Sequence, residues 1–141
     1  MMDYVIKAYN ALPQEALQLR ITVFVEEQGF TDEVDAFDSV ATHLVMFEGE
    51  EAIATCRFFL KEDNETYMFG RLCVLKEYRG KALGREMLKK VEEIVKEKGG
   101  KAIILHSQYH AKDFYVKCGF TQQGEIDYEQ NKPHAWMRKE V

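Results

Sequence analysis

Residues 71–85 combine residue types and spacings that suit phosphate binding. An apolar stretch, Arg71-Leu72-Cys73-Val74-Leu75, is followed after three residues by Arg79-Gly80-Lys81-Ala82-Leu83-Gly84-Arg85. The small residues of the second stretch let the main chain approach a ligand closely, and its three basic side chains concentrate positive charge. If a helix begins here, its first N–H groups lack internal partners and lie at the positive end of the helix dipole. A phosphate at this position would satisfy both the N–H groups and the dipole.

Two common phosphate loops are excluded, because the chain contains neither G-x-x-x-x-G-K-[ST] nor G-x-G-x-x-G. The local pattern alone leaves two interpretations open. Either the loop binds the phosphate of another ligand, or its small residues shape a tight turn whose cations are solvated.

The stretch Arg79-Gly80-Lys81-Ala82-Leu83-Gly84 resembles the signature [QR]-x-x-G-x-[GA] of the GNAT superfamily of N-acetyltransferases, with Ala82 where glycine is usual. Other stretches also resemble this family: Val23-Phe24-Val25-Glu26-Glu27-Gln28, Thr42-His43, Phe114-Tyr115-x-x-x-Gly119-Phe120 and Pro133-His134-x-x-Met137. Together they are similar to its ElaA-like and YjcF-like branch, over nearly the full length of the chain.

The resemblance implies an α/β (α+β) GNAT fold, with a mixed, mostly antiparallel central sheet, helices on both faces, and splayed fourth and fifth strands. We map these two strands to Tyr67–Leu75 and Lys101–Leu105. The implied co-substrate is acetyl-CoA, with no metal. Its pyrophosphate would lie on backbone amides of the loop, and its pantetheine amides would pair with the preceding strand as in β-strand addition. The implied cofactor-binding residues are Leu72, Cys73, Val74, Arg79, Gly80, Lys81, Ala82, Leu83, Gly84, Arg85 and Gln108.

The implied reaction is direct transfer of acetyl to a primary amine of an unidentified small molecule or peptide. Tyr115 matches the family's general-acid position, since a phenol is protonated at neutral pH and can donate to the departing thiolate. The alternative is that Tyr115 is a core aromatic residue packed with Phe114 and Phe120.

The general base stays open among Glu26, Glu27, His110 and His134, or the pocket lowers the pKa of the amine by desolvation. The resemblance also implies that Glu26, His43 and His134 line the acceptor pocket. The alternatives are a solvated glutamate and satisfied structural histidines. The acidic segment Asp32–Asp38 either attracts a cationic amine or is simply solvated.

Hydrophobic periodicity predicts the elements that must position these residues. We expect a strand at Tyr4–Tyr9, a helix from Pro13 to Glu27 that stops near Gly29, and a hairpin of His43–Glu48 with Ile53–Leu60. A helix from Leu83 should end at Gly99-Gly100, and a buried strand should follow at Ala102–Leu105. The remaining predicted elements are a short helix at His110–Cys118 and strands at Phe120–Tyr128 and His134–Arg138. All belong to one domain, residues 1–141.

Composition limits the class of protein. The chain has 141 residues, of which 46% are hydrophobic, and a net charge of −5, which argues against a general nucleic-acid binder. Three cysteines without framework spacing indicate a reducing compartment, and the cytoplasm is the expected location. No apolar run is long enough for a membrane span. His106-x-x-x-His110 lacks a third zinc ligand at natural spacing.

Three functions stay open at this point. The first is an acetyl-CoA-dependent N-acetyltransferase, for which a homodimer is an option. The second is a non-catalytic acyl-CoA-binding sensor, motivated by Ala82 in the signature. The third is an interaction domain whose glycine loop binds nothing.

Overall fold

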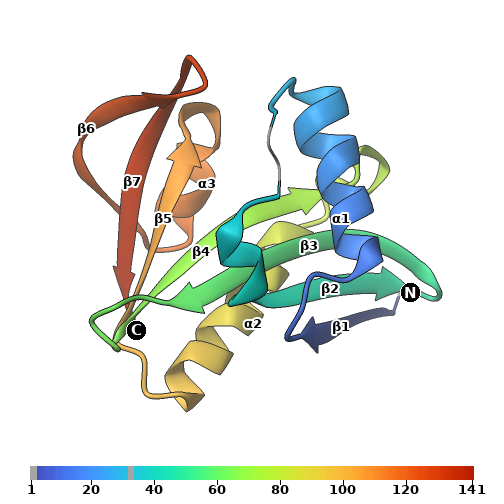
Figure 1. Ribbon diagram of the computed structural model, residues 1–141, viewed down its shortest axis with the longest axis horizontal. Helices are drawn as coiled ribbons and strands as arrows, with labels where there is room; N and C mark the ends of the chain where they lie inside the picture. Colours follow the sequence, from blue (N-terminus) through green and yellow to red (C-terminus); the bar gives the residue numbers. More distant parts are fainter. Residues whose placement is uncertain (1–2, 32–33) are drawn as a thin grey trace. The chain divides into compact units, whose positions relative to one another are not determined.

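The computed structural model describes residues 3–31 and 34–141, and its strands form one mixed sheet (Figure 1). The strand order is β1-β2-β3-β4-β5-β7-β6. β4 and β5 are parallel, whereas β1–β2, β2–β3, β5–β7 and β6–β7 are antiparallel. This arrangement confirms the expected mixed, mostly antiparallel sheet. The strands are β1 (Tyr4–Tyr9), β2 (Thr42–Glu48), β3 (Glu51–Leu60), β4 (Thr66–Val74), β5 (Ala102–Gln108), β6 (Thr121–Glu129) and β7 (Lys132–Glu140).

The helices lie close to their predicted positions. They are α1 (Gln14–Arg20), α2 (Leu83–Glu97) and α3 (Lys112–Lys117), with 3-10 helices at Ala36–Ser39, Lys76–Tyr78 and Tyr109–Ala111. In the described residues, no helix is long and apolar enough to cross a membrane.

The predicted first helix is confirmed in extent, but its second half is a π-helix, Ile21–Glu27. The N–H of Gln28 donates to the carbonyl of Val23, five residues earlier, at 3.1 Å. Four of the seven π-helical residues, Ile21, Thr22, Val23 and Val25, are β-branched, and such residues crowd the turns of an α-helix. π-Helical turns are rare and often occur at functional sites.

The chain forms two compact units. The first contains the chain up to Phe59 together with Arg71–Val91. Its core packs Ala16, Leu19 and Val23 of the first helix against side chains of β2 and β4: Val45, Phe47 and Cys73. Because side chains of a strand alternate between faces, Leu44 and Met46 lie on the other face of β2, and both are also buried. β2 is therefore covered on both faces.

The second unit contains Leu60–Gly70 and Glu92–Val141. The parallel register pairs Thr66–Phe69 of β4 with Ala102–Leu105 of β5. The predicted end of β5 at Leu105 was wrong, because the strand continues to Gln108 by pairing with β7. Hydrogen bonds to a strand distant in sequence therefore lengthen β5.

The predicted end of α2 at Gly99-Gly100 is confirmed. Gly99 has a φ of 80°, and the N–H of Gly100 donates to the carbonyl of Val95 at 2.9 Å. A Cβ atom on Gly100 would lie 2.5 Å from a side-chain carbon of Val95 and 2.8 Å from the ring of Tyr67. Only glycine fits where the chain turns into β5.

Candidate active site

Residues 79–85 lead from the segment after β4 into the first turn of α2, and they are hereafter called the cofactor loop. Gly80 and Ala82 both have left-handed backbone, with φ of 80° and 61°. The first bond of the helix ladder runs from the N–H of Glu86 to the carbonyl of Ala82, at 3.2 Å. The amides of residues 83–85 therefore precede the ladder and lie in the first helical turn, where N–H groups can bind an anion.

The departure from the signature at Ala82 has a structural consequence. A non-glycine residue in left-handed backbone costs roughly 1–2 kcal/mol. Ala82 is exposed, so its methyl group gains little burial to offset this cost. The backbone at Ala82 therefore has the left-handed conformation that glycine would adopt easily, and alanine adopts it with strain.

The side chain of Arg79 connects the cofactor loop to β4 and to the π-helix. Its Nε donates to the carbonyl of Val74 at 2.9 Å, and its two terminal nitrogens donate to the carboxylate of Glu27 at 2.6 and 2.9 Å. The hydrogen bond from Arg79 lowers the pKa of Glu27. The carboxylate of Glu27, a candidate base, is therefore already paired with Arg79. Lys81 and Arg85, the other two cations of the loop, are exposed.

In the strand before the loop, the side chain of Cys73 packs into the core, whereas its two neighbours are more exposed. Cys73 is 4% exposed and belongs to the core beneath the first helix, while its neighbours Leu72 and Val74 are less buried. Arg71, at the start of this segment, has a φ of 55° within β4.

In the second unit, Tyr115 lies on α3 and is 8% exposed. Its ring makes edge contacts with Phe69, Phe114 and Phe120, at centroid distances of 6.3, 4.9 and 5.8 Å. This packing agrees with the aromatic-core alternative, and it also holds the ring in one orientation, as a proton donor requires.

Gln108 is the last residue of β5 rather than a residue beyond it. Its side-chain oxygen lies 2.9 Å from Nε2 of His110, so a candidate cofactor contact and a candidate base are in contact with each other.

The three predicted acceptor residues differ in their surroundings. Glu26 is exposed on the π-helix. His43 is 1% exposed, and its Nε2 lies 2.9 Å from the carbonyl oxygen of Asp38. Burial lowers the pKa of His43, so a neutral ring donates to this carbonyl. These contacts favour a structural role for His43.

His134 is 3% exposed, with Nδ1 2.8 Å from the carbonyl oxygen of Lys132. Its ring stacks on His106, which also stacks on Trp136 and lies 2.6 Å from a carboxylate oxygen of Asp127. Sequence reasoning paired His106 with His110 instead. Among the described residues, no group of three or more His, Cys, Asp or Glu side chains could hold a metal ion.

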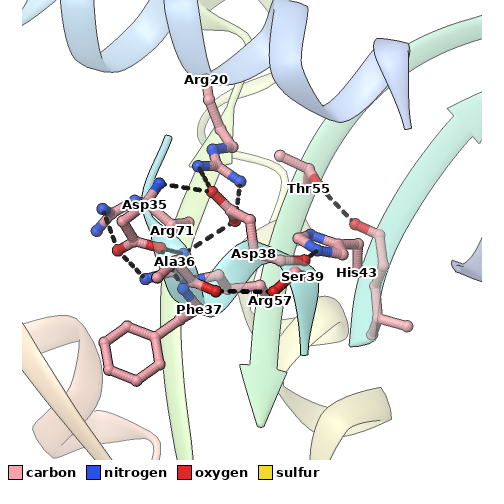
Figure 2. A network of polar contacts seen from close by, with 11 residues as sticks. Arg20, Asp35, Ala36, Phe37, Asp38, Ser39, His43, Thr55, Arg57 and Arg71 are labelled. Atoms are coloured by element: carbon pink, nitrogen blue, oxygen red, sulfur yellow. Dashed lines mark hydrogen bonds and ion pairs between the residues drawn. The ribbon is translucent and has the colours of Figure 1, made fainter. Parts of the chain in front are cut away.

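A charged cluster, buried at Arg20, Asp38 and Arg57, joins the first helix, the segment before β2, β3 and β4 (Figure 2). We call it the arginine network and define it as Arg20, Asp35, Asp38, Arg57 and Arg71. Arg20 binds both oxygens of Asp38, at 2.8 and 2.9 Å. Arg57 contacts Asp35 at 2.6 and 2.9 Å and Asp38 at 2.9 Å, and Arg71 contacts Asp35 at 3.2 Å.

The charges of this network are strongly coupled. Burial opposes ionisation of Asp38, but hydrogen bonds from Arg20, the Asp35 N–H and Arg57 outweigh it and hold the pKa of Asp38 well below its usual range. The carboxylates of Asp35 and Asp38 are thus neither simply solvated nor available to attract an amine. Asp32 and Glu33, which complete the acidic segment, lie outside the described residues.

Sequence reasoning missed the arginine network, although one signal was present. Arg20 and Arg57 each stand between apolar residues, in Leu19-Arg20-Ile21 and Cys56-Arg57-Phe58. A cation at such a position needs a buried partner, because an unpaired charge is costly to bury.

Known proteins resemble this chain over nearly its whole length. Residues 10–141 match the family described as acetyltransferase (GNAT) domain. YyaT of Bacillus subtilis is 36% identical over 90% of this chain and 88% of its own. YjcF of the same organism, named an N-acetyltransferase, is 29% identical over 90% of this chain and 91% of its own.

ElaA of Escherichia coli is similar in both sequence and structure. It is 31% identical over 89% of this chain and 85% of its own. Its crystal structure superposes with a TM-score of 0.84 at 27% identity, covering 99% of each chain. The expected branch is confirmed. The chain therefore belongs to the GNAT family of acetyltransferases.

Proposed function

We propose that the protein transfers the acetyl group of acetyl-CoA directly to a primary amine of a small molecule or peptide. The observation that carries this proposal is the cofactor loop, whose left-handed Gly80 and Ala82 precede the first turn of α2 in a chain of the acetyltransferase family. We also propose a single catalytic domain over residues 1–141. We also propose a cytoplasmic location.

The pyrophosphate of acetyl-CoA is assigned to the amides of residues 80–85, with Lys81 and Arg85 nearby. Arg79 contributes by positioning the loop, since its guanidinium is bonded to Glu27. The pantetheine arm is assigned to the main chain of Leu72, Cys73 and Val74, and Gln108 is a further contact.

In the proposed reaction, the nitrogen lone pair of the amine attacks the thioester carbonyl carbon. A C–N bond forms, the C–S bond breaks, and the electron pair of that bond leaves on the sulfur of CoA. Tyr115 donates the phenolic proton to this thiolate, and a base accepts the proton that the amine loses.

On the acceptor side we assign Glu26 and His134, while His43 has the structural role that its burial and its contact with Asp38 favour. A carbonyl oxygen can only accept, so Nδ1 of His134 donates to Lys132, and Nε2 is the ring nitrogen that we assign to accept the proton of the amine. This orientation of the ring supports His134 as the base.

A second candidate is a non-catalytic acyl-CoA sensor, which is favoured by the strained Ala82 in the signature. Titration calorimetry with acetyl-CoA tests the ligand, and release of free CoA thiol with a panel of primary amines tests catalysis. Binding with amine-dependent thiol release supports the enzyme. Binding without release across the panel supports the sensor, and no binding excludes both.

A further inference from the structure

The aromatic ring of Phe37 presents a flat apolar surface to solvent. Phe37 is 51% exposed, whereas Phe59 of β3, on which its ring stacks, is 9% exposed. The two ring centroids are 4.6 Å apart, and the ring planes differ by 7°. Because Phe59 covers one face of the Phe37 ring, a ligand can reach the opposite face and the edges.

The backbone of Phe37 is bonded on both sides. Its N–H donates to a carboxylate oxygen of Asp35 at 3.1 Å, and its carbonyl accepts from the N–H groups of Val40 and Ala41 at 3.1 and 3.0 Å. Asp35 is itself held by Arg57, at 2.6 and 2.9 Å. A ring fixed in this way loses little conformational freedom when a ligand binds, and such preorganisation favours affinity.

Phe37 is also connected to the segment that we assign to the cofactor. The carboxylate of Asp35 that accepts the N–H of Phe37 also accepts from Arg71 of β4, at 3.2 Å. Arg71 directly precedes Leu72–Val74, the segment assigned to pantetheine. An arm that starts at the cofactor loop and runs back along this segment covers about 10 Å, at roughly 3.3 Å per strand residue, and ends next to Arg71. One carboxylate therefore links Phe37 to the assigned thioester end, and this step rests on the proposed function.

The chemistry of the Phe37 ring favours one kind of substituent. An apolar side chain that is merely exposed is common and needs no ligand, but Phe37 is in addition fixed in orientation and linked to the cofactor segment. In Figure 2 its ring points away from the ion pairs of the arginine network, so a group on its open face meets an apolar surface. Stacked or edge contacts between aromatic rings are worth more than the burial of their area alone. A second ring on the open face would continue the stack of Phe59 and Phe37.

We propose that the acceptor is a primary amine whose substituent carries an aromatic ring, and that this ring binds on the open face of Phe37. The amino group, at the other end of the substituent, then lies toward Arg71, where the thioester is assigned. Phe37 is thus a residue that determines acceptor specificity, and Asp35 positions it.

Calorimetry on the full chain with saturating CoA tests this proposal with acetylated amines, which are products of the proposed reaction. The panel contains N-acetylbenzylamine and N-acetylphenethylamine, the cyclohexyl counterpart of each, and N-ethylacetamide. A cyclohexyl group has at least as much apolar surface as a phenyl group, so burial alone cannot favour the phenyl compounds. We expect at least one phenyl compound to bind roughly 2- to 10-fold more tightly than its cyclohexyl counterpart, the usual advantage of an aromatic pair. N-ethylacetamide, which has no ring, should bind most weakly.

Three variants show whether the Phe37 ring is the cause. Phe37→Leu keeps an apolar side chain against Phe59 but removes the flat face, so the preference for phenyl should disappear. Phe37→Tyr keeps the ring and should keep the preference. Tyr128→Leu is the matched control, because it removes a ring that is 71% exposed on β6 and should change nothing. Circular dichroism establishes that each variant is folded.

The proposal is overturned if the wild-type protein binds the cyclohexyl compounds equally or more tightly, if it binds none of the panel, or if the preference for phenyl survives in Phe37→Leu. Analytical ultracentrifugation tests another occupant of this surface, a second copy of the chain. A wild-type dimer that Phe37→Leu separates into monomers would assign the ring to that contact and would also overturn the proposal. An assembly state that the variant leaves unchanged supports a ligand on the ring.

The same titrations separate this proposal from the proposed function. If CoA itself does not bind, the proposed function fails. If CoA binds and amines are acetylated without any preference for an aromatic ring, only the role of Phe37 fails.

Discussion

Arg79 and Glu27 are 52 residues apart, yet a two-pronged ion pair joins them, with N···O distances of 2.6 and 2.9 Å. Glu27 is the last residue of the π-helix, and Arg79 begins the cofactor loop. The pair connects the candidate phosphate site to the helix that carries Glu26, and Arg79 also holds the carbonyl of Val74. The side chain of Arg79, which the sequence analysis assigned to the cofactor, therefore holds the loop in its conformation.

Breaking this pair should weaken acetyl-CoA binding more than it weakens the fold. Glu27→Gln leaves Arg79 without its carboxylate, so we expect roughly a 3- to 10-fold loss of affinity by calorimetry. The free energy of unfolding should fall by less than about 1 kcal/mol, because both side chains are more than a third exposed. Glu26→Gln, next to it on the exposed surface, is the control and should leave affinity unchanged. Equal affinity in Glu27→Gln and wild type would contradict this role.

Ala82→Gly should stabilise the protein. The substitution removes roughly 1–2 kcal/mol of backbone strain from the folded state. It also gives the unfolded chain more conformational entropy, which lowers stability by about 0.4–1 kcal/mol. The expected net gain is about 0.5–1 kcal/mol in urea unfolding. Ala16→Gly, in the buried face of α1, should have the opposite sign. A loss of stability in Ala82→Gly would show that the left-handed backbone is not strained.

Asp38→Asn should be strongly destabilising at neutral pH. It leaves Arg20 and Arg57 without the carboxylate that pairs them in the interior, a change that typically costs about 3–5 kcal/mol. Asp113→Asn, on the surface, should cost far less and serves as the control.

The pH dependence of this loss has a definite sign. Because the pKa of Asp38 is lowered in the folded protein, its stabilisation is complete above the unfolded value of about 3.9 and declines as pH falls toward the folded value. The difference in unfolding free energy between wild type and Asp38→Asn should therefore be constant from pH 7 to 5 and shrink below about pH 4. A difference that grows on acidification would contradict the assignment.

Tyr115→Phe tests the general acid. The three ring contacts of Tyr115 do not need its hydroxyl, so acetyl-CoA affinity should be unchanged. The rate constant kcat for acetyl transfer should fall by about 100-fold or more, the usual contribution of a positioned proton donor. Tyr109→Phe, at an exposed tyrosine, should retain full turnover. Full turnover in Tyr115→Phe would remove Tyr115 from the mechanism.

Much of the fold could be predicted from sequence because its signals are local. Alternation identified β1, helical spacing identified α2, and Gly99-Gly100 marked the end of that helix. The cofactor loop was also a local signal, since small and basic residues follow one another there in the chain.

Features that depend on distant partners could not be predicted in this way. β5 is three residues longer than its apolar run because β7 pairs with it. The charges of Asp35 and Asp38 looked like a solvated acidic segment, yet they lie against Arg20, Arg57 and Arg71, up to 36 residues away. Local sequence determined where helices, strands and the cofactor loop occur, because backbone preferences and periodicity act over a few residues. Tertiary structure alone decided which charges meet, because ion pairs form only after the sheet brings distant segments together.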